Sequence, residues 1–256
     1  MSIYQKNRPG KYFVAVCDIL GFSDLVRDKK LCVVVEQHLA WFRKALNHSI
    51  HKGEFPDAVP PASDLNSHTH VGAAWFSDSV LLYSKEDTDD AVREVLTSVA
   101  WLIFETMMQG KTRIRAGIAY GEAFIDPENS LFVGQPIIDA HDLEKKQQWS
   151  GAALTKSAVD RLPEAVRSGK YADWWVIPYD VPLKKGATLA TLAVNWNQGL
   201  HLPSSPLKWS KNSDLPSPND WAAKRDICEK FVNTKIFHEK YCHACRPPGY
   251  GKNDKL

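Results

Sequence analysis

Residues 13–23 read FVAVCDILGFS, a run that is apolar and rich in β-branched residues until it reaches Asp18. Such a run predicts a buried strand, here ending at Asp18 and passing through Gly21 into the polar start of a helix. A carboxylate at a strand end beside free backbone amides can hold a divalent cation. The amides can hold the phosphates that the cation neutralises. The stretch therefore predicts metal and phosphate chemistry at the end of the first strand.

A second acid, Asp78, stands in residues 71–84, VGAAWFSDSVLLYS. Two apolar runs flank a Ser-Asp-Ser turn, which predicts a β-hairpin with Asp78 at its tip. The tip can meet Asp18 on a neighbouring strand. Two converging carboxylates repel each other unless a cation joins them. Such a pair is a usual ligand set for two Mg²⁺ ions that also bind substrate phosphates.

Five stretches, in this order, resemble motifs of the class III nucleotidyl cyclases. They are DILGFS at 18–23, FSDS at 76–79, RIRAGIAYG at 113–121, VGQPIIDA at 133–140 and LKKGATLATL at 183–192. The resemblance implies an α+β, ferredoxin-like domain with a βαββαβ core over residues 10–196. It also implies two Mg²⁺ or Mn²⁺ ions per site, and a homodimer whose active sites are each shared between two subunits.

The resemblance assigns roles to single residues. The metal ligands are Asp18, Asp78 and the backbone carbonyl of Ile19; the phosphate-binding amides are Leu20, Gly21, Phe22 and Ser23; the candidate cationic groups are Arg115, Lys184 and Lys185. The implied reaction is attack of the ribose 3′-oxygen on the α-phosphorus of the same nucleotide, with release of pyrophosphate.

The residues that select a purine in this family are missing. Ala74 and Leu131 stand at the two base-reading positions, and Ile138 and Asp142 replace the transition-state Asn and Arg. This pattern resembles the Pycsar pyrimidine cyclases of bacterial anti-phage systems. That resemblance implies a second messenger made from UTP, or from CTP, and a separate effector reached through the cyclic nucleotide. Phe76 is a candidate to narrow the base pocket.

Two other functions stay open. One is a nucleotide-binding sensor with the same fold and no activity; the other is an adenylate or guanylate cyclase whose base reader lies elsewhere. Retention of both Asp18 and Asp78 argues against the sensor, because converging carboxylates cost stability when unpaired. Ala74 with Leu131 argues against the purine enzyme.

Composition limits the partners and the compartment. The chain has 256 residues and a net charge of +2, which gives no electrostatic basis for binding nucleic acid or a membrane. It contains no apolar run of about 18 residues, and its first residues lack the apolar core of a signal peptide. Five scattered cysteines, with Cys17 and Cys32 in apolar stretches, predict buried free thiols. We expect a cytoplasmic protein.

Local patterns predict the remaining organisation, with helices on one face of the sheet. The expected elements are one helix over 24–48, a loop over 53–67, a helix from Thr88 to Gly110, strands over 113–119 and 122–125, helices over 136–147 and 152–165, and strands over 174–181 and 187–195. A proline- and serine-rich connector over 197–219 and a helical extension over 220–256 follow. His238, Cys242 and Cys245 have zinc-compatible spacing, but a frayed helix with free thiols is the expectation.

Overall fold

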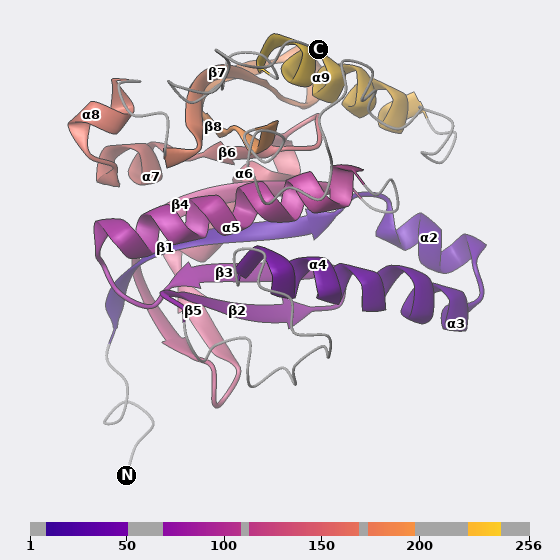
Figure 1. Ribbon diagram of the computed structural model, residues 1–256, viewed down its shortest axis with the longest axis horizontal. Coiled ribbons are helices and arrows are strands. Elements are labelled where there is room, and N and C mark those ends of the chain that lie inside the picture. The colour runs from indigo at the N-terminus through magenta and orange to yellow at the C-terminus, as the bar shows by residue number, and fades with distance from the viewer. Residues whose placement is uncertain (1–8, 51–68, 109–112, 169–173, 198–224, 242–256) are drawn as a thin grey trace, which may run out of the picture.

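The computed structural model describes residues 9–50, 69–108, 113–168, 174–197 and 225–241. Within them, one eight-stranded sheet has the order β2-β3-β1-β4-β6-β8-β7, and β5 pairs with β4 outside this path (Figure 1). The strands are β1 Gly10–Ile19, β2 Val71–Phe76, β3 Ser79–Ser84, β4 Ile114–Asp126, β5 Leu131–Gly134, β6 Ala152–Leu154, β7 Val176–Pro182 and β8 Thr188–Val194. Only the β4–β6 pair is parallel among the described strand pairs.

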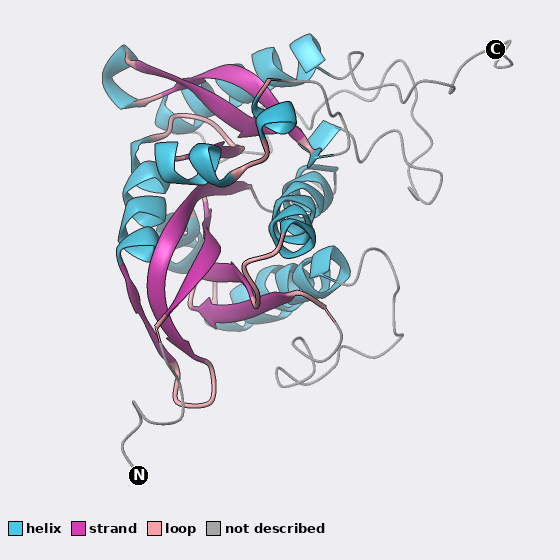
Figure 2. Cartoon of the chain, turned by 90° about the vertical axis from the view of Figure 1, so that its left-hand side faces the viewer, coloured by secondary structure: helices cyan, strands magenta, loops and turns pink. Residues whose placement is uncertain are grey.

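Helices cover both faces of this sheet (Figure 2). They are α2 Phe22–Asp28, α3 Leu31–Val33, the π-helix η1 Val34–Leu39, α4 Ala40–Ile50, α5 Asp89–Met108, α6 Gln135–Lys146, α7 Lys156–Arg161, α8 Glu164–Arg167, the 3₁₀ turn η4 Lys184–Gly186 and α9 Arg225–Tyr241. None of the described helices has the length and hydrophobicity that a membrane span requires.

The α+β class is confirmed, but the expectation that helices cover one face is wrong. Side chains alternate along a strand, so the apolar run of β1 presents two apolar faces. Phe13 and Ala15 pack in the core that includes α4 and α5, whereas Val14 and Val16 pack with Ala140 of α6. Both faces of β1 must therefore be covered.

The hairpin and several helices form as the sequence predicts. β2 and β3 pair in antiparallel register from Val71–Ser84 to Phe76–Ser79. Thr88 caps α5, since its Oγ1 accepts a hydrogen bond from the Ala91 amide at 3.2 Å. The predicted loop 53–67, the helix end at Gly110, residues 198–219 of the predicted connector, and Cys242 and Cys245 lie outside the described residues.

Three predicted elements differ in the structure. The helix expected over 24–48 is interrupted at Lys29, whose backbone is extended, and becomes a π-helix over η1. Residues 152–154 form β6 rather than the start of a helix, because β4 and β8 flank them. The two strands expected over 113–125 are one continuous strand, β4. Cys17 is buried as expected, whereas Cys32 is exposed.

Candidate active site

The pairing of β1 with β3 brings the two predicted metal acids to one corner. Asp18 lies opposite Ser79, the residue that follows Asp78. The Ile19 amide donates to the Asp78 carbonyl at 3.0 Å, and the Ser79 hydroxyl donates to Asp18 Oδ1 at 3.3 Å. The hairpin turn is thus fixed against the end of β1 by the antiparallel pairing of β1 with β3.

The electrostatic environment of Asp18 disfavours an uncompensated carboxylate. Burial raises the pKa of Asp18 to about 6, and the negative charges of Glu144 and Asp78 add to this effect. Arg115 and the Ser79 hydrogen bond act in the opposite direction. A cation placed between Asp18 and Asp78 would offset both the desolvation and the repulsion.

Glu144 is a site residue that the sequence patterns did not single out. It lies on α6, is only 2% exposed, and receives Arg115 Nε and Nη2 at its Oε1, each at 2.5 Å. Arg115 Nη1 donates to the Gln147 carbonyl at 2.9 Å. Arg115 lies on β4 opposite Asp18 and was a candidate to contact the substrate. In the structure its guanidinium instead donates hydrogen bonds to Glu144 and Gln147 within the protein.

The donor set suits Mg²⁺ or Mn²⁺. Mg²⁺ binds through one or two carboxylates, retained waters and substrate phosphate oxygens, rather than through an all-protein cage. Asp18 and Asp78 would supply the carboxylates; Ile19, which follows Asp18 and whose amide binds the Asp78 carbonyl, has a buried side chain and would offer its backbone carbonyl. Among the described residues, this corner included, no group of three or more His, Cys, Asp or Glu side chains could hold a metal, so retained waters and substrate oxygens would have to complete the coordination.

The predicted phosphate amides follow directly after β1. The Leu20 amide donates to the Arg113 carbonyl at 2.8 Å, so it is already used within the sheet. Gly21 has φ 77° and ψ 13°, a left-handed conformation that glycine adopts at low cost, and α2 begins at Phe22. Gly21, Phe22 and Ser23 are the amides left for a phosphate.

A cavity of about 400 Å³ lies between α6 and residues of β1, β3 and β5. Its walls are mostly apolar, and they consist of Val16, Phe76, Ser79, Val80, Leu81, Ser130, Phe132, Ile137, Ile138 and His141. The rings of Phe76 and Phe132 meet edge to face with centroids 5.7 Å apart. Ser79 belongs to this cavity and to the Asp18 corner, so the two adjoin.

Of the other predicted site residues, some line the cavity and some do not. Phe76 lines the cavity, and Ala74 packs on the same face of the sheet. On β5, Phe132 faces the cavity, while its neighbour Leu131 does not line it. Lys184 and Lys185 lie exposed at the β7–β8 turn, apart from the residues of the cavity. Because successive side chains of a strand point to opposite faces, the sequence could have identified Phe132, next to Leu131, as the alternative cavity residue.

The sequence matches no protein-family model and no curated protein sequence. The structure is similar to the monomeric guanylyl cyclase domain of the RhoGC fusion protein from the aquatic fungus Blastocladiella emersonii, with a TM-score of 0.52, 13% identity and coverage of 73% of this chain and 96% of that one. It is similar to the catalytic core of a rhodopsin-guanylyl cyclase with converted specificity in complex with ATPalphaS, with a TM-score of 0.52, 14% identity and coverage of 73% and 97%.

A bacterial light-regulated adenylyl cyclase also matches, with a TM-score of 0.47, 14% identity and coverage of 74% of this chain. The chain spans about half (53%) of the length of that protein. Together with the sheet order and the two-faced helix packing, the similarities at 0.52 identify the fold. The chain has the fold of nucleotide cyclase catalytic domains.

Proposed function

We propose that this chain is a class III nucleotidyl cyclase that converts UTP, or less readily CTP, into the 3′,5′-cyclic nucleotide and pyrophosphate. The observation that carries the proposal is the meeting of Asp18 and Asp78 beside an apolar cavity of about 400 Å³. The carboxylates suit the metal-bound triphosphate, and the cavity suits a base. The resemblance in sequence and the cyclase fold support the same class of reaction.

The chain's own residues would bind and orient the nucleotide. Asp18 and Asp78, with the Ile19 carbonyl, would hold two Mg²⁺ or Mn²⁺ ions, which when bound favour ionisation of the 3′-hydroxyl and neutralise the triphosphate. The amides of Gly21 to Ser23 would orient the phosphates. The apolar walls of the cavity would keep water from the ribose and so favour attack by the 3′-oxygen over hydrolysis.

The composition of the cavity supports a pyrimidine. The aromatic rings of Phe76 and Phe132 form two of its walls, and they would pack against a base without adding a charge. His141 on α6 and Ser130 in the turn between β4 and β5 are polar residues of the lining, and they would contact the edge of the base. Ala74 adds no polar group from the same face of the sheet. The preference for UTP comes from the subgroup that the sequence resembles.

A homodimer with composite sites is part of the proposal. Two large apolar side chains that line the cavity are exposed, Phe76 at 48% and Ile138 at 55%. Contiguous exposed apolar surface of this kind is typical of protein interfaces. A second copy of the chain would cover it and would bring Lys184 and Lys185 to the triphosphate of the other subunit.

The cellular part of the proposal rests on the resemblance to the anti-phage cyclases. The cyclic nucleotide would be a second messenger made in the cytoplasm, and a separate effector would respond to it. A non-catalytic nucleotide sensor is the alternative, and it is favoured if the protein binds nucleotides through Asp18 without turning them over.

The deciding experiment incubates the purified chain with UTP, CTP, ATP or GTP, each with Mg²⁺ and with Mn²⁺, and identifies the product by mass spectrometry. We expect cyclic UMP first and cyclic CMP second. A preference for ATP or GTP would reject the pyrimidine assignment and leave the cyclase assignment standing. No cyclic product from any nucleotide would reject the enzyme and favour the sensor.

A further inference from the structure

The segment Gln147–Ser150 connects α6 to β6 and lies between the C-terminal helix α9 and the candidate site; we call it the connecting segment. All four of its side chains are buried. Buried polar groups cost stability unless they are hydrogen-bonded. The hydrogen-bond partners of this segment therefore identify the elements that hold it in place.

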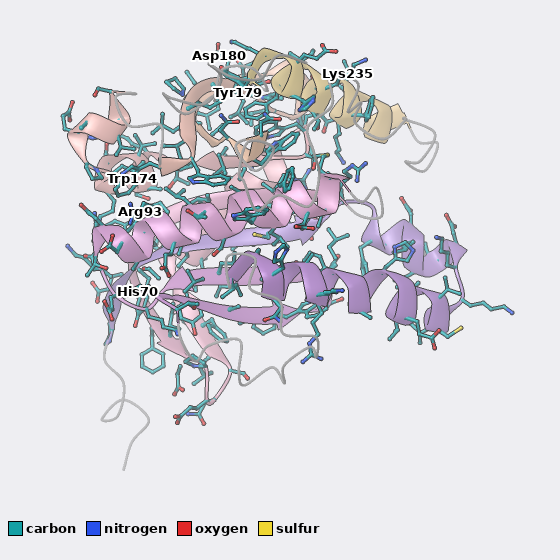
Figure 3. All side chains as sticks on the ribbon, in the orientation of Figure 1. His70, Arg93, Trp174, Tyr179, Asp180 and Lys235 are labelled. Carbon is teal, nitrogen blue, oxygen red and sulfur yellow. The ribbon has the colours of Figure 1, made fainter. Side chains whose placement is uncertain are left out.

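Helix α9 holds the outer side of the connecting segment. Asn233 Nδ2 donates to the Gln148 carbonyl at 2.7 Å, and Thr234 Oγ1 accepts from the Ser150 amide at 2.8 Å. Thr234 is fully buried. The ring of Phe237 packs edge to face on Trp149 with centroids 4.8 Å apart. Figure 3 shows Tyr179, another ring of this cluster, beside α9.

On the side that faces the sheet, the connecting segment forms hydrogen bonds with three successive residues of β4. Ser150 Oγ donates to the Ile114 carbonyl at 2.7 Å, and Gln147 Nε2 donates to the Ala116 carbonyl at 2.7 Å. Between them, Arg115 Nη1 donates to the Gln147 carbonyl. The connecting segment therefore fixes the residue that stands opposite Asp18 in the sheet.

The direction in which Arg115 points matters for a metal site at Asp18. A guanidinium paired with Asp18 would compete with a cation for the same carboxylate oxygens. In the structure, Glu144 and the Gln147 carbonyl hold the guanidinium instead. A displaced connecting segment would remove one of these two acceptors and release Arg115 toward its cross-strand neighbour.

We infer that α9 is a positioning element of the site: through Asn233, Thr234 and the connecting segment it keeps Arg115 on Glu144, and so leaves Asp18 free to bind a divalent cation. The inference rests on the metal site of the proposed function, but not on the identity of the nucleotide or on turnover. It assigns α9 a part in metal binding through contacts with the connecting segment, from which it is separated by more than 80 residues in the sequence.

The test measures Mn²⁺ binding to the full chain without nucleotide, by isothermal titration calorimetry. Thr234→Val keeps the shape of the side chain and removes the acceptor for Ser150; Asn233→Ala removes the second contact. We expect each to weaken Mn²⁺ binding about 3- to 10-fold, and Glu144→Gln to weaken it about 10- to 100-fold, the range for residues that orient metal ligands. Thr234→Ser keeps the hydroxyl that accepts from Ser150, so this variant should bind Mn²⁺ with the wild-type affinity.

The matched control is Lys235→Ala on the same helix (Figure 3). Lys235 is exposed and pairs only loosely with Glu239, at 3.7 Å, so its removal should leave the Mn²⁺ affinity unchanged. Thermal melting of each variant separates positioning from folding. If Thr234→Val and Asn233→Ala lower the melting temperature but bind Mn²⁺ like the wild type, α9 only stabilises the fold and the inference is wrong.

The outcomes for the metal site and for the enzyme are distinct. If Asp18→Asn leaves Mn²⁺ binding unchanged, there is no site for α9 to position and the inference fails. If Mn²⁺ binding depends on Asp18 and Thr234 while no nucleotide is cyclised, the proposed cyclase fails and the positioning role of α9 stands.

Discussion

Arg115 stands directly opposite Asp18 in the pairing of β1 with β4, yet its guanidinium binds Glu144 on α6. Three acids, Asp18, Asp78 and Glu144, therefore share this corner with one base. Two negative charges remain in excess among these four groups, which matches the demand of a divalent cation.

The first prediction concerns the two carboxylates. Asp18→Asn and Asp78→Asn each remove a charge that would hold the metal-bound triphosphate, and we expect each to lower kcat by more than about 100-fold, beyond the usual effect of outer partners of a metal site. Asp180→Asn on β7 is the matched control, because Asp180 is exposed and lies among the residues of another part of the sheet (Figure 3). Near-normal turnover in either site variant would contradict the two-metal assignment.

The second prediction concerns pH and stability. The pKa of Asp18 is raised from 3.8 to about 6 in the folded chain, so between these values the folded chain binds a proton that the unfolded chain has released. The contribution of Asp18 to the free energy of unfolding is thus most favourable below about pH 4 and falls as the pH rises to about 6. Asp18→Asn should remove this dependence and stabilise the apo chain at pH 7 by no more than about 3 kcal/mol. Denaturant unfolding of both proteins at pH 4 and pH 7 measures it; an equal stability difference at the two pH values would contradict the shift.

Local patterns in the sequence predicted the parts of the site that lie within one element or one hairpin. The run ending at Asp18 and the turn carrying Asp78 are such parts, because strand length and turn chemistry place both acids. The pairing of Arg115 with Glu144 joins residues 29 apart on a strand and a helix, and no local period records it. Only the packing of α6 on β4 brings them together.

Short apolar runs explain the remaining differences. Ala152–Leu154 is compatible with a strand or with a buried helix, and its neighbours β4 and β8 make it a strand. On β5 a shift of one residue exchanges the two faces, which separates the expected base reader Leu131 from the observed cavity residue Phe132. The sequence predicted the element but not which of its faces meets the cavity.

The third prediction separates those two neighbours. Phe132→Ala removes an aromatic wall of the cavity, and stacking of a base on an aromatic side chain contributes about 1–3 kcal/mol. We expect kcat/KM for the preferred nucleotide to fall about 5- to 150-fold, chiefly through KM. Leu131→Ala should have a smaller effect, because Leu131 does not line the cavity. Initial rates with all four nucleotides measure this. A larger effect of Leu131→Ala than of Phe132→Ala would contradict the prediction and assign base recognition to Leu131.

The fourth prediction concerns the exposed apolar surface around the cavity. Ile138→Glu places a charge where a second subunit would have to bury it, so we expect the dimer to dissociate and the activity to fall in parallel. Val232→Glu, at an exposed position of α9, should leave the dimer intact. Sedimentation velocity at several concentrations measures both. A wild-type chain that is monomeric and fully active would remove the composite site.

The fifth prediction concerns the contact that sets α6 against the sheet. A Cβ on Gly117 would lie 2.0 Å from the Ala140 carbonyl oxygen, so Gly117→Ala must push the backbone of α6 away from β4. We expect a destabilisation of about 1–3 kcal/mol, the usual range for overpacking, together with loss of Mn²⁺ affinity, because α6 carries Glu144. Gly121→Ala is the control, since its Cβ would meet Pro136 at an ordinary 3.4 Å. Denaturant unfolding and Mn²⁺ titration measure the two effects separately. Destabilisation without a change in Mn²⁺ affinity would show that the metal corner tolerates movement of α6, and would weaken the role assigned to Glu144.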